Sequence, residues 1–153
     1  MGYIPSDAKW YLAEIVQEIS VEGDPRRVVH TNLVLVRGDS PDEAYAKAVE
    51  LGTESEISYV NPDGKLVAIT HCGLRDLNVI HGELEHGTEL SHSEEIDMDD
   101  SAIQRYISPK EELGVFAPIK VSRGPCYISK DVVEELSKKF PDLNLHEGLT
   151  PPK

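Results

Sequence analysis

A helix start signal lies between two hairpin signals, and this arrangement restricts the possible folds most strongly. Ser40-Pro41-Asp42-Glu43 combines an N-cap serine, a proline at the first helical position and a glutamate at the capping-box position. Small and apolar residues then recur on one face, and Gly52 stands where a left-handed C-cap is expected. The pattern predicts a helix over residues 41–51.

Segments rich in β-branched residues lie on both sides of this helix. Turn sequences, Glu22-Gly23-Asp24-Pro25 and Asn61-Pro62-Asp63-Gly64, separate them in pairs. The first segment also fits helical spacing, but its β-branched content favours a strand. The predicted strands are 10–20, 27–37, 56–61, 65–72 and 74–80. We therefore expect an α+β fold, a curved antiparallel sheet in the order β-β-α-β-β-β with one helix packed on a face.

The chain divides into three parts by composition. Residues 1–92 hold the strand and helix signals and are expected to form the α+β core domain. Residues 93–107 are an acidic linker or surface segment. Residues 108–153 form a C-terminal extension, with a helix near 130–140 that Ser129 can cap.

Acidic residues outnumber basic ones strongly. The 153 residues include 28 Asp and Glu but only 15 Lys and Arg, which gives a formal net charge of −13. This balance argues against binding to nucleic acid or to an anionic membrane. The densest acidic run is the predicted contact surface for a basic partner: Glu94, Glu95, Asp97, Asp99 and Asp100.

The first residues carry neither a basic n-region nor an apolar h-region, so we expect no signal peptide. The two cysteines, Cys72 and Cys126, lie far apart in the sequence, which favours reduced thiols over a disulfide framework. Cys72 ends an apolar stretch and is expected to be buried. A cytoplasmic protein is the expectation.

Four polar residues are the candidates for a ligand pocket. His30 and Asn32 share one face of a predicted strand, and Asp76 and Asn78 share a face of another. Polar side chains on a mostly apolar face need hydrogen-bond partners, so they form either a structural network or the floor of a pocket. One acid beside an amide suits hydrogen bonding better than acid–base chemistry.

The histidines and neighbouring acids resemble a set of metal ligands, but their spacing does not. A zinc helix places histidines four residues apart, whereas the gaps among His81, His86 and His92 are five and six. His81 and His92 could still meet across a hairpin. We expect no bound metal and no cofactor.

Scattered residue pairs resemble the bacterial family catalogued as domain of unknown function 4288, over about residues 10–90. The pairs are Trp10-Tyr11, Glu22-Gly23, His30-x-Asn32, Ala44-Tyr45, Leu51-Gly52, Asn61 with Gly64, Gly73-Leu74-x-Asp76-Leu77, and Glu83-Leu84 ahead of Glu89-Leu90. The resemblance implies a bacterial, cytoplasmic setting and no particular activity.

Two functions remain open. In the first, the protein is a non-catalytic acidic module, an inhibitor or immunity protein that neutralises a basic partner such as a toxin. In the second, it is a small-ligand-binding domain or an enzyme with a pocket around His30, Asn32, Asp76 and Asn78. The chain contains no nucleophile elbow and no phosphate loop, which favours the first function.

Overall fold

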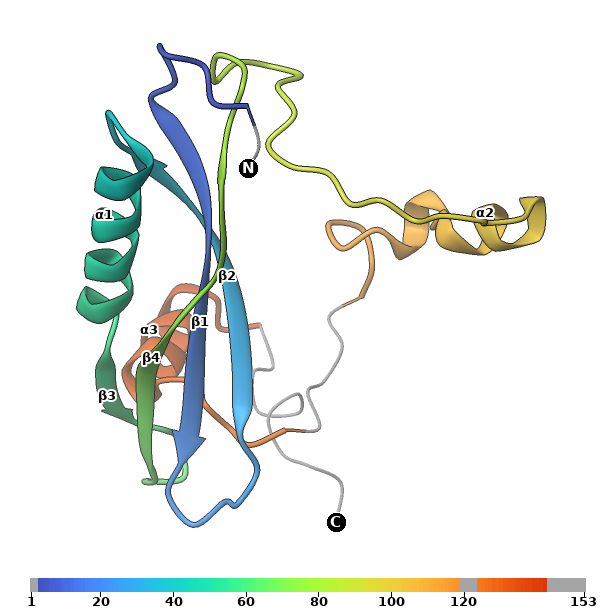
Figure 1. Ribbon diagram of the computed structural model, residues 1–153. Coiled ribbons are helices and arrows are strands. Elements are labelled where there is room, and N and C mark those ends of the chain that lie inside the picture. Colours follow the sequence, from blue (N-terminus) through green and yellow to red (C-terminus); the bar gives the residue numbers. More distant parts are fainter. Residues whose placement is uncertain (1–2, 119–123, 143–153) are drawn as a thin grey trace.

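The computed structural model describes residues 3–118 and 124–142. A four-stranded antiparallel sheet with one helix against it forms the centre of the molecule (Figure 1). The predicted α+β class is confirmed, although residues 119–123 and 143–153 of the expected extension lie outside the described residues. The elements are β1 (Trp10–Val21), β2 (Val28–Arg37), α1 (Pro41–Glu54), β3 (Ile57–Val60), β4 (Leu66–Val79), α2 (Asp100–Tyr106), the 3₁₀ helix η1 (Lys110–Glu112) and α3 (Lys130–Lys139).

The strands lie in the order β2-β1-β4-β3, so the first strand is central. β1 pairs with β2 along one side and with β4 along the other. β3 is short and pairs only with the first residues of β4. No strand among the described residues therefore pairs with the second edge of β4 in its upper half, from Thr70 onward.

β4 is one strand where the sequence predicted two. Gly73, which lies between the two predicted strands, adopts a φ of 144° within one continuous strand. The register against β1 shifts twice, leaving Arg75 and Cys72 as extra residues. Such β-bulges bend a strand without ending it, and glycine tolerates the positive φ. The prediction that Cys72 is buried is wrong, because its bulge leaves the residue exposed.

α1 begins as predicted and ends later. The Glu43 N–H donates to the Ser40 hydroxyl at 3.1 Å, which confirms the N-cap. The helix continues to Glu54, with Ser55 at the C-cap. Gly52 is therefore an interior residue of the last turn, and the predicted C-cap is wrong.

The core lies on the face of the sheet that α1 covers. One cluster joins β1, β2 and α1: Tyr11, Ala13, Ile15, Val36, Ala44 and Ala48. A second cluster lies at the other end of the sheet, where Tyr127 packs against Ile19, Val21 and Val67. The C-terminal extension therefore contributes to the core beyond the end of α1.

The opposite face of the sheet, here called the open face, carries neither α1 nor the Tyr127 contact. Strand alternation places three aliphatic side chains of β2 on it. These are Val29, Leu33 and Leu35, which are 59%, 65% and 44% exposed. On β1 their cross-strand partners are Glu18, Glu14 and Leu12.

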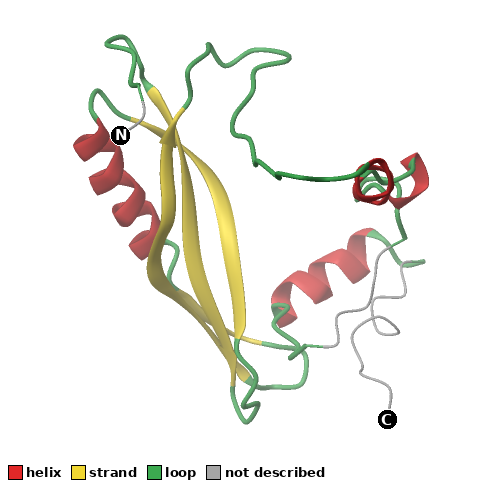
Figure 2. Ribbon diagram, turned by 45° about the vertical axis from the view of Figure 1, so that its right-hand side comes forward, coloured by secondary structure: helices red, strands yellow, loops and turns green. Residues whose placement is uncertain are grey.

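Residues 93–107, here called the acidic arm, leave the top of the sheet and carry α2 well away from it (Figures 1 and 2). The sequence did not predict α2. Asp99 is its N-cap, and its carboxylate accepts a hydrogen bond from the Ala102 N–H at 2.7 Å. No helix among the described residues is both long and apolar enough to cross a bilayer.

Candidate functional site

The structure separates the four residues of the predicted pocket into two pairs. His30 and Asn32 lie opposite Gln17 and Ile15 of β1, on the face that α1 covers. Asp76 lies opposite Glu14, on the open face, and Asn78 lies beside it. The sheet itself stands between the pairs, so the four residues do not line one pocket.

Asn32 belongs to a hydrogen-bonded network beneath the end of α1. Its amide donates to Gln17 Oε1 at 2.7 Å, and the Gln17 amide donates to the Ser55 hydroxyl at 2.5 Å. That hydroxyl donates to the carbonyl of Gly52 at 2.6 Å. The chain of bonds ties β2 through β1 to the helix, so Asn32 has a structural role. Sequence reasoning missed Gln17, the exception in an otherwise apolar strand face.

His30 contacts the C-terminal extension. Its ring meets that of Tyr127 edge-on, with centroids 5.4 Å apart and planes at 81°. The Tyr59 hydroxyl donates to the carbonyl of Tyr127, and Asn61 Nδ2 donates to the carbonyl of Cys126 at 2.9 Å. Burial raises the pKa of Tyr59, so its phenol stays protonated and keeps donating. This surface holds the extension on the sheet.

His71 lies beside the same network. Its backbone N–H donates to Glu56 Oε1 at 3.1 Å, and its ring packs against the backbone of Gly52. Nδ1 is buried, with no hydrogen-bond partner among the described residues. The half-buried imidazole lies between the end of α1 and the sheet and packs against both.

Asp76 and Asn78 bond to each other on the open face, with Asn78 Nδ2 donating to Asp76 Oδ2 at 2.8 Å. Arg75 approaches Glu14 nearby, at 3.6 Å between Nε and Oε2. Both Asp76 and Asn78 are exposed. The two side chains form a hydrogen-bonded pair on the surface of the sheet.

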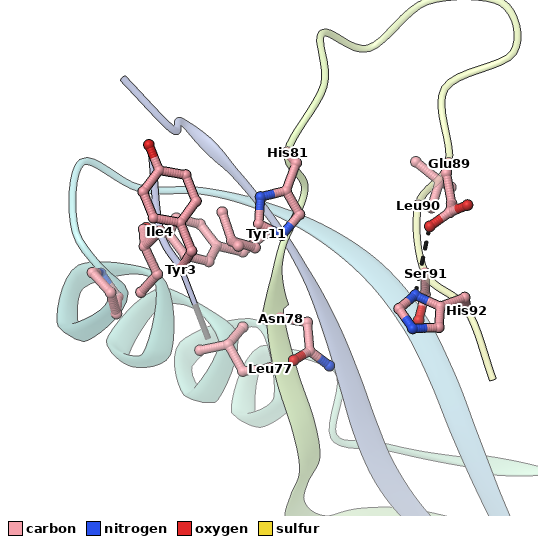
Figure 3. A pocket seen from close by; sticks show the side chains of 12 residues that line it. Tyr3, Ile4, Tyr11, Leu77, Asn78, His81, Glu89, Leu90, Ser91 and His92 are labelled. Atoms are coloured by element: carbon pink, nitrogen blue, oxygen red, sulfur yellow. Dashed lines mark ion pairs between the residues drawn. The ribbon is translucent and has the colours of Figure 1, made fainter. Parts of the chain in front are cut away.

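A hollow of about 450 Å³ lies beside the upper half of β4 (Figure 3). Asn78, His81 and His92 line it, together with the N-terminal Tyr3 and Ile4. His92 Nδ1 lies 3.5 Å from Glu89 Oε1, and this pair stands apart from His81 in Figure 3. Among the described residues, no group of three or more His, Cys, Asp or Glu side chains is placed to hold a metal.

All five predicted contact residues lie on the acidic arm and are exposed: Glu94, Glu95, Asp97, Asp99 and Asp100. None forms an ion pair with another described residue. No Lys or Arg occurs between Asp76 and Gln104. The arm therefore presents uncompensated negative charge to solvent.

A family model described as "Domain of unknown function (DUF4288)" matches residues 10–91. The matched segment contains the whole sheet and α1, with the loop that lines the hollow. No curated protein and no solved structure matches the chain. The match covers more than half of the chain, and the chain therefore belongs to the DUF4288 family.

Proposed function

We propose that the protein is a non-catalytic module that binds a basic protein partner through its acidic arm. The observation that carries the proposal is the placement of five uncompensated carboxylates on a segment that stands clear of the sheet. A concentrated field of one sign speeds association with a partner of opposite charge and selects against acidic competitors.

The proposed role is that of an inhibitor or immunity protein that neutralises a basic bacterial toxin. An acidic surface of this kind can cover a cationic active site. The same acidic residues then serve both fast binding and inhibition. We place this function in the bacterial cytoplasm, and the two free cysteines, Cys72 and Cys126, are compatible with a reducing compartment.

The test begins with co-purification from the native host to obtain the partner. Association rates are then measured for a variant in which Glu94, Glu95, Asp97, Asp99 and Asp100 become Gln or Asn. Asn at position 99 preserves the N-cap of α2, so α2 should remain folded. We expect the association rate to fall about tenfold at low salt and to lose most of its salt dependence.

A matched control neutralises five acids that form no ion pair among the described residues and lie off the arm: Glu50, Glu54, Asp63, Glu111 and Asp131. The control changes the net charge by the same amount as the arm variant. A larger fall in association rate for the arm variant therefore shows that the location of the charges on the arm matters. Equal rates for the two variants would remove the arm from the binding surface.

The hollow beside Asn78 supports a second candidate function, the binding of a small polar molecule. Saturation-transfer NMR with a panel of polar metabolites tests it. Asn78→Ala and His81→Ala should each weaken a specific signal. A signal that survives both changes would place the ligand elsewhere.

A further inference from the structure

Six side chains at the end of the sheet beyond α1 form a site, here called the socket, that residues 124–128 fill. These five residues are here called the strap. Tyr127 of the strap packs on the second core cluster and meets His30 edge-on, and Pro125 is buried as well. The socket consists of Ile19, Val21, His30, Tyr59, Asn61 and Val67.

The socket holds the strap by its main chain. The Tyr59 hydroxyl donates to the carbonyl of Tyr127, and Asn61 Nδ2 donates to the carbonyl of Cys126 at 2.9 Å. Every residue carries such a carbonyl, so these two bonds place no demand on sequence. Selection comes from Tyr127, which packs on the apolar cluster, and from the buried Pro125. Bonds to the main chain for affinity, with surfaces that select side chains, are the features of a peptide-binding site.

The donor group of Asn61 is oriented by the sheet itself. Its side chain is 1% exposed, and Oδ1 accepts hydrogen bonds from the N–H groups of Asp63 and Lys65 at 3.0 and 2.9 Å. These bonds close the turn between β3 and β4 and leave Nδ2 directed at the strap. A donor that is fixed before a ligand arrives loses little freedom on binding, which favours affinity.

The socket and the strap belong to different parts of the chain. All six socket residues lie within residues 10–91, the segment that matches the family model, whereas the strap lies beyond it. The connection from Ile80 to the strap includes the acidic arm, which stands clear of the sheet (Figure 2). A ligand on so long a tether is supplied at an effective concentration of about 1 mM or less. A free ligand can therefore compete with the strap.

We propose that the socket is a binding site for short non-helical peptide segments of the form Pro-x-Tyr, that the strap occupies it in cis, and that such a segment of a partner protein takes it in trans. A second copy of this chain is a poor source, because its own strap fills its own socket. A hollow of about 280 Å³ adjoins Pro125 and Cys126, so the central position x accepts larger side chains. The socket is separate from the acidic arm, and this site does not depend on the proposed function.

Removal of the strap's aromatic anchor tests the proposal in the full chain. Tyr127→Ala should empty the socket. The probe is a fluorescent peptide with the sequence of residues 124–129, carrying Cys126→Ser to prevent oxidation. We expect fluorescence anisotropy to give a dissociation constant at least about tenfold lower for Tyr127→Ala than for the natural chain, in which the strap competes.

Matched controls accompany both the protein and the peptide. Phe140→Ala removes another aromatic side chain of the extension, which is 56% exposed, and this variant should bind the peptide as weakly as the natural chain does. A peptide that carries Tyr127→Ala should not bind the emptied socket, because it lacks the anchor.

A second substitution checks that the peptide takes the place of the strap. In the Tyr127→Ala background, Tyr59→Phe removes the hydroxyl that donates to the main-chain carbonyl, and the peptide should bind about fivefold more weakly. Tyr45→Phe is the control, because it removes a tyrosine hydroxyl from a residue of α1 that is 57% exposed. Equal affinities for these two variants would contradict the proposed mode of binding.

The natural chain gives an independent measurement. Excess peptide should displace the strap, so the NMR signals of Ile128 should shift with peptide concentration, whereas those of α2 should not. Signals of Ile128 that stay fixed at saturating peptide would show that the strap does not leave the socket, and would overturn the proposal.

Four further outcomes overturn it. A Tyr127→Ala chain that loses the circular-dichroism signal of the sheet shows that the strap is an inseparable part of the core. A folded Tyr127→Ala chain that does not bind the peptide, or that binds it no better than the natural chain does, shows that the socket is not the binding site. A complex between the natural chain and Tyr127→Ala assigns the ligand in trans to a second copy rather than to a partner protein.

Discussion

Gly52 of α1 lies directly against the imidazole of His71 on β4, so that a Cβ at position 52 would overlap the ring. The contact sets how closely the last turn of the helix approaches the sheet. We predict that Gly52→Ala destabilises the protein by about 1–3 kcal/mol, since an added methyl group in a packed site forces a shift. Urea denaturation gives the free energy of unfolding.

Gly52→Ala should have the opposite effect on stability when the His71 imidazole is absent. In a His71→Ala background the added Cβ meets no imidazole, and alanine in a helix interior is favoured over glycine by about 0.5–1 kcal/mol. The cost of Gly52→Ala should then vanish or change sign. An equal cost in both backgrounds would show that the ring contact does not determine the residue at position 52.

The amide of Gln17 joins two partners beneath α1, and its removal should be costly. Gln17→Ala leaves the Asn32 amide without its acceptor and the Ser55 hydroxyl without a donor. We predict a loss of about 1–3 kcal/mol in unfolding free energy. Asn78→Ala, which breaks an exposed bond on the other face, should change stability by no more than about 0.5 kcal/mol. Similar losses for both variants would contradict a special role for the network.

Asp24 gives a pH-dependent contribution to stability. Hydrogen bonds from the side chain and the backbone N–H of Arg26 lower the pKa of Asp24 from 3.8 to about 2. A folded-state pKa below the unfolded value means that this contribution is complete above about pH 4 and disappears as the pH falls toward 2. Denaturation midpoints of the natural chain and of Asp24→Asn should therefore converge over that interval. A constant difference between them would exclude this titration.

The two histidines of the hollow should not bind zinc tightly. Structural zinc takes four protein ligands and catalytic zinc takes three, whereas Figure 3 shows His81 apart from the Glu89–His92 pair. Calorimetric titration of tag-free protein with zinc should show no stoichiometric site. A site that is lost in His81→Ala would prove this prediction wrong.

Local signals in the sequence predicted the helix start and the strands, because caps, turns and alternation act over a few residues. Gly52 was assigned wrongly because a glycine serves a left-handed cap and a close helix approach equally well, and only tertiary packing separates the two. The sequence also could not show on which face of the sheet each polar residue of β4 lies. Each bulge in β4 reverses the alternation, so the face on which Asp76 lies depends on a register that no short pattern encodes. α2 was missed because its cap, Asp99, lies within a run of acids.

The central place of the first strand has a consequence for synthesis on the ribosome. β1 is made first and can pair at once with β2, but its other edge must wait for Leu66–Val79. Until that segment emerges, the nascent chain carries an open apolar strand, with α1 already available to shield one side of it. The long-range pairing of β1 with β4 is therefore the step that closes the sheet, and its sequence separation makes it the slow one.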